Sequence, residues 1–182
     1  HYFERLLPRL RRILELDPEA YIILRVHLEM SAPWWRKLYP EELELWGDGR
    51  TENQSYASAL WRQQAGDFLE GLVHFLQGVP EGERVIGYQP AAGQTGEWVK
   101  EAAMEGHAND YSEPMRAYFR GWLNRKYGSL NDLRLAWRDG RAMFNTAEVP
   151  TPEEQEAADL YHFRDPTRSR KVIDYFQCVA DL

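Results

Sequence analysis

The stretch Tyr-Ile-Ile-Leu-Arg-Val-His-Leu-Glu at positions 21–29 decides the fold class of this chain. Apolar residues recur at every second position along it, and this period of two is typical of a β-strand. One face carries Ile22, Leu24, Val26 and Leu28, and the other carries Ile23, Arg25, His27 and Glu29. The second face is polar along its C-terminal half, which is unusual for a strand that is expected to be buried.

Helical patterns lie on both sides of this strand. Apolar side chains recur at helical spacing over residues 2–16, and a long helix is predicted from about Ser55 to Gln77. A second strand, rich in Val, Ile and Tyr, is predicted from Arg84 to Gln89. Strands separated by long helices pair in parallel through right-handed crossovers, so the predicted fold class is α/β. Two strands alone cannot make a buried parallel sheet.

Loops and further helices make up the rest of the predicted structure. Residues 31–54 have no sustained period and are expected to form a long loop with one short helical turn. Ser112 and Ser129 are predicted to open two helices, and Gly128 to end the first of them. Thr151-Pro152-Glu153-Glu154 matches a capping box. The last helix is expected to begin at Asp165-Pro166 and to bury Val172, Ile173, Phe176 and Val179.

Composition excludes several classes of protein. The chain has 182 residues, a net charge of −7 and one cysteine, Cys178. Nucleic acid is not an expected partner, because phosphate binding needs clustered Lys and Arg that outweigh the acids. One cysteine excludes an internal disulfide, and no apolar run approaches the roughly 20 residues that a membrane span requires. His74, His107 and His162 lack a ligand-like spacing, so neither a metal nor a cofactor is expected.

The residues that could carry chemistry follow the two predicted strands. In α/β folds the functional loops follow the C-terminal ends of the strands. If the strands are neighbours, one rim holds His27, Glu29, Trp34, Trp35, Gln89, Glu97 and Trp98. Such a rim offers carboxylates for proton transfer, hydrogen-bonding groups, and flat aromatic faces on which the C–H surface of a sugar can stack. Carbohydrate is therefore the expected partner.

Each of these residues also has a structural interpretation. Arg25 lies deeper in the strand and is expected to join a network of buried charges, whereas His27 and Glu29 fit such a network and substrate binding equally well. One of Trp34 and Trp35 is expected to pack and the other to line the site. Packing roles are assigned to Trp61, Trp122 and Trp137, and solvated helix faces to Glu41, Glu42, Glu44 and the 153–156 cluster.

Three segments carry a more specific pattern. They are Ser-Ala-Pro-Trp-Trp at 31–35, Val-Ile-Gly-Tyr-Gln at 85–89, and Phe-Arg-Gly-Trp-Leu-Asn-Arg-Lys-Tyr-Gly-Ser-Leu at 119–130, which continues to Leu133 and Ala136-Trp137. In this order they resemble the family 42 β-galactosidases. The first resembles the Ala-Pro-Pro-Trp segment after the third barrel strand, the second resembles the fourth strand, and the third resembles a helical segment.

The resemblance implies a retaining glycosidase with a (β/α)₈ TIM barrel. Residues 1–182 would be a single fragment of the catalytic domain, from about its second helix to its fourth. Glu97 answers to the acid/base residue of the family, whose nucleophile comes from a later strand that this sequence does not reach. Gly96 stands where the family has an Asn, which favours a divergent relative without assured β-galactosidase specificity.

Other interpretations stay open. The chain could be a non-catalytic carbohydrate-binding or scaffold protein that has lost one carboxylate, or a complete small α/β domain with accidental similarity; Glu97 could also cap a helix. A start at His1 and an end at Leu182 inside an apolar-periodic stretch favour a partial segment. A half-barrel leaves open sheet edges, so we expect the isolated segment to self-associate as a homo-oligomer or to fold poorly.

Overall fold

The computed structural model describes residues 2–29, 32–93, 98, 101–157 and 163–182. The chain divides into two compact units. The first unit is His1–Glu29 with Arg62–Lys100, and the second is Met30–Trp61 with Glu101–Leu182. The parallel strands belong to the first unit, whereas a short hairpin and most of the short helices belong to the second.

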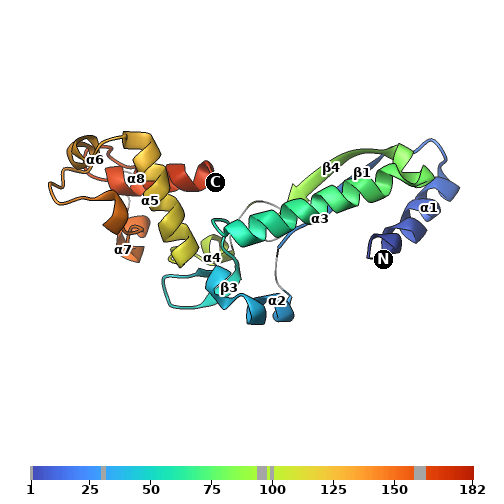
Figure 1. Ribbon diagram of the computed structural model, residues 1–182, viewed down its shortest axis with the longest axis horizontal. Helices are drawn as coiled ribbons and strands as arrows, with labels where there is room; N and C mark the ends of the chain where they lie inside the picture. The colour runs from blue at the N-terminus through green and yellow to red at the C-terminus, as the bar shows by residue number, and fades with distance from the viewer. Residues whose placement is uncertain (1, 30–31, 94–97, 99–100, 158–162) are drawn as a thin grey trace. The chain divides into compact units, whose positions relative to one another are not determined.

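The sheet of the first unit confirms the parallel pairing. Strand β1 (Ile22–His27) pairs with β4 (Val85–Ala91), and Figure 1 shows them side by side with helix α3 (Ala59–Gln77) running along them. In the described part of the chain this sheet has two strands. The predicted strand ends are within two residues of those observed, and the predicted long helix begins four residues later than expected.

Burial along β1 follows the predicted alternation. Ile22, Val26 and Leu28 are buried, whereas Ile23 is 65% exposed. Apolar residues of the helices complete the interior of this unit: Leu10 of α1 (Leu7–Leu16), which follows the 3₁₀ turn η1 (Phe3–Leu6), and Ala65, Leu72 and Leu76 of α3. The sheet therefore has one covered face, and its other face is open in this structure.

A tight turn leads from α3 into β4. It includes the 3₁₀ turn η3 (Pro80–Arg84), in which the Gly82 N–H donates to the Val79 carbonyl at 3.0 Å. A Cβ at Gly82 would lie 1.8 Å from the Leu76 carbonyl oxygen, so no other residue fits without a backbone shift. Only glycine therefore fits at position 82, in the turn that connects α3 to β4.

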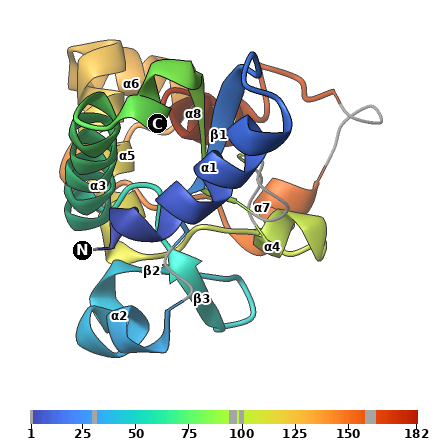
Figure 2. The same ribbon diagram turned by 90° about the vertical axis from the view of Figure 1, so that its right-hand side faces the viewer.

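The segment predicted as a loop with one helical turn has more regular structure than expected. Helix α2 (Pro33–Leu38) and the 3₁₀ turn η2 (Pro40–Glu42) precede an antiparallel hairpin of β2 (Leu43–Leu45) and β3 (Thr51–Gln54). Figure 2 shows α2 beside this hairpin, to which Arg36 is bonded through the Thr51 carbonyl at 3.0 Å. Strands of three and four residues are too short for a period of two to be recognised in the sequence.

The assignment of Glu44 to a solvated helix face was wrong. This residue lies in β2, is 2% exposed, and accepts a hydrogen bond from Asn109 Nδ2. A buried carboxylate needs such donors. Without them, the loss of its hydration would destabilise the folded state by roughly several kcal/mol. The donor comes from a segment far along the chain, which a local pattern of acids does not reveal.

Helix caps in the second unit were predicted correctly. Ser112 caps α5 (Glu113–Tyr127), Gly128 ends it with a φ of 68°, and Ser129 caps α6 (Leu130–Trp137). The capping box at Thr151 opens α7 (Pro152–Glu156) with both of its reciprocal hydrogen bonds present. Two short elements complete this region, α4 (Glu101–Met104) and the 3₁₀ turn η5 (Phe144–Thr146). None of the helices in the described ranges is long and apolar enough to cross a membrane.

The last helix differs from its prediction in start and in orientation. Helix α8 spans Arg170–Ala180, because Asp165 instead closes a local turn by accepting bonds from the Thr167 N–H and hydroxyl. Val172 is buried as expected, but Phe176 is 44% exposed. The inward face carries Tyr175, whose hydroxyl donates to the Asn109 carbonyl at 2.6 Å. This bond and the packing against α5 select a different helical face from the one that hydrophobicity indicated.

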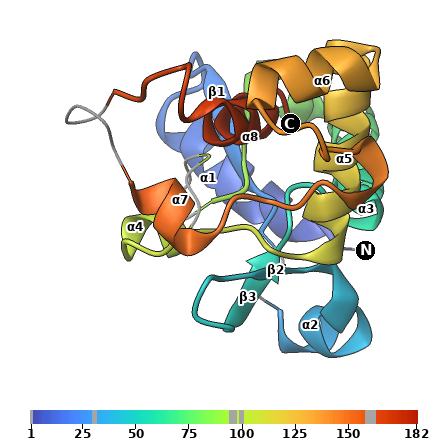
Figure 3. The same cartoon turned by 90° about the vertical axis from the view of Figure 1, so that its left-hand side faces the viewer.

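Helices α5, α6 and α8 enclose the core of the second unit (Figure 3). Phe119 lies at its centre, with its ring against those of Trp122, Trp137 and Tyr175. Trp61, at the start of α3, is 4% exposed and stacks on Tyr56. The packing roles predicted for the three helical tryptophans are confirmed.

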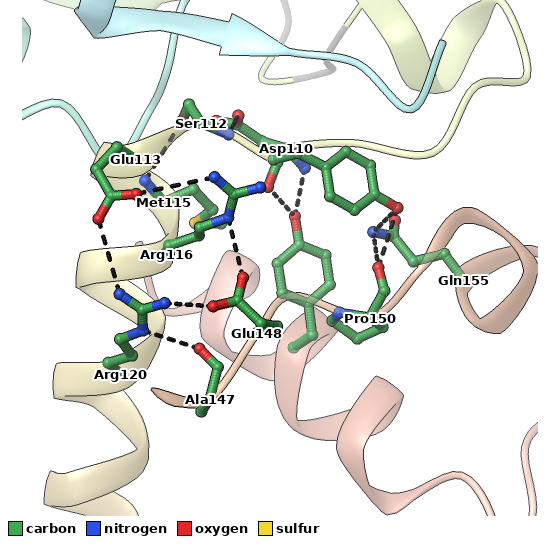
Figure 4. Close-up of polar contacts among 12 residues, drawn as sticks. Asp110, Ser112, Glu113, Met115, Arg116, Arg120, Ala147, Glu148, Pro150 and Gln155 are labelled. Atoms are coloured by element: carbon green, nitrogen blue, oxygen red, sulfur yellow. Dashed lines mark hydrogen bonds and ion pairs between the residues drawn. The ribbon is translucent and has the colours of Figure 1, made fainter. Parts of the chain in front are cut away.

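A buried polar network anchors the segment before α5. Asp110 is 3% exposed and accepts from the Leu45 N–H, the Ser112 N–H and the Ser55 hydroxyl, at 3.1, 2.9 and 2.6 Å. Its own N–H donates to the Tyr175 hydroxyl at 2.5 Å. Burial and the nearby Asp110 carboxylate raise the pKa of Tyr175, which therefore stays protonated. Figure 4 shows Asp110 and Ser112 of this network together with the Arg116–Glu148–Arg120 ion pairs beside α5.

Cys178 is expected to resist alkylation in the native protein. It is fully buried, and burial, reinforced by the Asp181 carboxylate, raises the pKa of its thiol to about 12. At pH 8 the thiolate fraction is then about 10⁻⁴, whereas an unfolded thiol with a pKa near 8.5 has a fraction of about 0.2. Iodoacetamide labelling followed by mass spectrometry should be at least about 1,000-fold slower in buffer than in guanidinium. Equal rates in both solvents would contradict the burial of this thiol.

Candidate active site

The C-terminal edge of the parallel sheet in the first unit is the candidate site. Because β1 and β4 are parallel, their carboxyl ends lie at the same edge. The Leu28 N–H donates to the Ala91 carbonyl at 2.7 Å, so the ladder continues beyond the last residue of β1. The hydrogen-bonded pairing of the two strands therefore reaches Leu28.

Arg25 and Gln89 form the inner pair of the site. They are register partners, and Arg25 Nε donates to Gln89 Oε1 at 3.1 Å. Both side chains are exposed on the open face of the sheet. Two positions before Gln89, Gly87 leaves open space on this face, where a Cβ would meet only the Ile23 side chain, at 3.8 Å and beyond. The predicted site residue Gln89 is thus held by the guanidinium that the sequence assigned to a structural role.

His27 and Glu29 form the outer pair. Residues two apart on an extended chain point to the same side, and His27 Nδ1 lies 3.1 Å from Glu29 Oε1. The two side chains are 50% and 25% exposed. Glu29 Oε2 is buried and has no hydrogen-bond partner within the described part of the chain. An ionised carboxylate only accepts hydrogen bonds, so this contact favours the tautomer with the imidazole proton on Nδ1.

Trp98 is the aromatic component of this edge. Its indole Nε1 donates to the Pro90 carbonyl at 3.2 Å, and 55% of the residue remains exposed. Because one edge of the ring is fixed by this bond, the indole is an oriented, accessible surface. Such a surface can stack on the apolar face of a sugar ring.

The other predicted aromatic residues belong to the second unit. Trp35 is completely buried and packs on Tyr39, with ring centroids 5.3 Å apart, whereas Trp34 is 65% exposed. The expectation that one of the two indoles packs is confirmed. The role of Trp34 in a site stays a prediction.

Glu97, the predicted acid/base residue, lies outside the described residues. Its neighbour Trp98 is described, and so is the strand that leads to this loop. The assignment of Glu97 therefore depends on the sequence resemblance alone. Among the residues that the structure describes, no group of three or more His, Cys, Asp and Glu could hold a metal ion.

Comparison with known proteins identifies the fold. The structure superposes on a β-galactosidase from the Antarctic haloarchaeon Halorubrum lacusprofundi with a TM-score of 0.72 and 17% identity, covering 98% of this chain and 25% of that one. The structure resembles a segment of the β-galactosidases. For the enzyme from Bacillus circulans sp. alkalophilus the TM-score is 0.63 and the identity 18%, over 98% of this chain and 27% of that chain.

A family 42 β-galactosidase from G. stearothermophilus gives a TM-score of 0.62 at 16% identity, over 97% of this chain and 25% of that enzyme. This chain thus spans about a quarter of the length of the β-galactosidases it matches. Neither a protein-family model nor a curated protein sequence matches it. At these identities the likeness shows the fold, an α/β arrangement with parallel strands.

The sequence did not single out the pairing of Arg25 with Gln89. The only available signal was the position of each residue near the end of a strand, and that does not specify the register. Buried acids of the second unit were also missed: Glu44, Asp110 and Asp174. For Asp110 a weak signal exists, since an Asp two residues before a capping Ser can accept the Ser112 N–H, as it does here at 2.9 Å.

Proposed function

We propose that this chain is part of the catalytic domain of a retaining β-glycosidase with a (β/α)₈ barrel, similar to the β-galactosidases. The observation that carries the proposal is the match of almost the whole chain to β-galactosidases, with polar side chains at the carboxyl edge of the paired strands. In barrel enzymes this edge is where substrates bind. Carbohydrate is accordingly the proposed partner, and self-association of the isolated segment stays a prediction.

In the proposed reaction Glu97 is the acid/base residue. It protonates the leaving oxygen while a second carboxylate, about 5 Å away, attacks the anomeric carbon, and it then takes a proton from the water that releases the sugar. The nucleophile would come from a later strand of the barrel. The residues of this chain supply the proton donor and part of the sugar-binding surface.

The described residues fit distinct parts of sugar binding. Gln89 and His27 can hydrogen-bond sugar hydroxyls, and Glu29 orients the imidazole at 3.1 Å. Trp98 can stack on the ring face, which leaves its bond to the Pro90 carbonyl intact. Trp34, exposed in the second unit, is proposed as a further binding surface.

The test is the stereochemical course of hydrolysis. The protein that carries this chain is incubated with 4-nitrophenyl β-D-galactopyranoside, and the first sugar product is followed by NMR. Retention requires that the β-anomer forms first and then mutarotates. Initial release of the α-anomer would exclude the double-displacement mechanism. Binding of the sugar without hydrolysis would favour the non-catalytic carbohydrate-binding alternative.

A further inference from the structure

The open face of the β1/β4 sheet holds Arg25, an arginine that forms no ion pair with any residue that the structure describes. Arg25 uses Nε to donate to Gln89 Oε1, and its two terminal nitrogens have no acceptor among the residues that the structure describes. None of the ion pairs within those ranges includes Arg25. A guanidinium has five N–H donors and stays charged at any physiological pH. Within the described ranges, four of these five donors therefore have no acceptor.

The carboxylate of Glu29, which the structure describes at this rim, does not pair with Arg25. Glu29 lies four residues beyond Arg25, which corresponds to about 13 Å along an extended strand. Its Oε1 is directed to His27 Nδ1 at 3.1 Å, and its Oε2 is buried. The positive charge of Arg25 and the negative charge of Glu29 are thus separated, and the group that contacts the Glu29 carboxylate is the His27 imidazole.

The neighbouring groups add donors on the same face. Gln89 Oε1 accepts from Arg25, so the amide is oriented with its NH₂ group away from the guanidinium. Gly87, on the same face, leaves room beside these groups. The inner part of the site is therefore cationic and rich in donors, a combination that is complementary to an anion.

We propose that the sugar bound at this site is acidic, a hexuronic acid residue whose carboxylate pairs with Arg25. This inference rests on the proposed glycosidase function and specifies its substrate class. A guanidinium binds a carboxylate through two parallel hydrogen bonds. The terminal nitrogens of Arg25, which have no acceptor among the described residues, can form such a pair while Nε keeps its bond to Gln89 Oε1. Gln89 donates to the same carboxylate or to the adjacent ring hydroxyl.

The kinetic test compares two substrates that differ only at C6. For the protein that carries this chain, kcat/KM is measured with 4-nitrophenyl β-D-galacturonide and with the corresponding galactoside. We expect the galacturonide to be preferred by at least about 10-fold, and Arg25→Gln to lower the galacturonide-to-galactoside ratio by about 100-fold. Arg25→Lys keeps the positive charge but cannot form two parallel hydrogen bonds to a carboxylate. Its galacturonide-to-galactoside ratio should therefore lie between those of the unmodified protein and Arg25→Gln. Arg9→Gln, on the exposed side of α1, is the matched control.

A binding measurement separates this inference from the proposed function. Calorimetric titration with D-galacturonate and D-galactose needs no catalysis. If neither glycoside is cleaved, the proposed function fails, yet tighter binding of galacturonate that Arg25→Gln abolishes still supports the anion site. Equal binding of the two sugars by the unmodified protein, or a galacturonate preference that Arg25→Gln leaves intact, overturns the inference. Should Arg25→Gln not fold, the unmodified protein and Arg25→Lys decide the question.

Discussion

Replacing Glu97 by Gln is expected to lower kcat/KM for 4-nitrophenyl glycosides by a factor of about 100 to 10,000 in the protein that carries this chain. The amide has the size of the carboxylic acid, but it can neither donate the proton that the leaving oxygen needs nor accept one from water. Binding of the sugar should change little, since the proposed stacking on Trp98 and the proposed hydrogen bond to Gln89 are retained. Initial rates over a range of substrate concentrations measure this loss.

The leaving group distinguishes an acid/base role from a structural one. A 2,4-dinitrophenolate leaves without protonation, so the first step of the Glu97→Gln reaction should stay fast with that substrate, and the glycosyl-enzyme should accumulate. Azide attacks that intermediate without base assistance, and glycosyl azide should form. Glu83→Gln, at an exposed position before β4, is the matched control. Unchanged turnover of Glu97→Gln, or an equal loss with every leaving group, would contradict the assignment.

Replacing Asp174 by Ala is expected to destabilise the second unit by about 3 kcal/mol. Asp174 is completely buried and accepts from Lys126 Nζ, the Tyr127 hydroxyl and Trp137 Nε1, at 2.8, 2.6 and 2.7 Å. Burial, and then the bond to Asp174, raise the pKa of Tyr127, so its hydroxyl remains a donor. The substitution leaves two neutral donors and a cation without this acceptor.

The expected loss is at the lower end of what broken buried pairs cost, about 3 to 5 kcal/mol, because the Lys126 side chain is 27% exposed and can turn to water. Urea unfolding monitored by tryptophan fluorescence measures it. Asp139→Asn, exposed on the same unit, should stay within about 0.5 kcal/mol of the unmodified protein. If Asp174→Ala unfolds at the same urea concentration as this control, the buried carboxylate is not a structural centre of the unit.

Local patterns were sufficient for much of the regular structure. The alternation in β1 and the caps at Ser112, Gly128 and Thr151 were predicted, because the interactions behind them lie within a few residues of one another. Parallel pairing was also predicted, since a long helix between two strands leaves that arrangement as the usual one. For the site, the sequence indicated His27, Glu29, Gln89 and Trp98, and the structure places all four in the same unit.

The incorrect predictions of burial share a cause. Glu44 is buried because Asn109, 65 residues away, supplies a donor. The face of α8 is selected by the contact of Tyr175 with Asn109 and Asp110, again 65 or 66 residues distant. Neither partner is visible in a window of neighbouring residues, so hydrophobicity and charge alone gave the wrong environment for Glu44 and Phe176.

The sequence by itself determined that Arg25, His27 and Glu29 share one face of a strand, because side chains two positions apart on an extended backbone point the same way. Only the tertiary structure decided that Gln89 is the residue beside Arg25. The register of the two strands shifts between Ile22 and Ile23, and it joins residues 64 positions apart. Register is a property of the two paired strands together, and the alternation within either strand does not specify which residue of the other strand lies beside it.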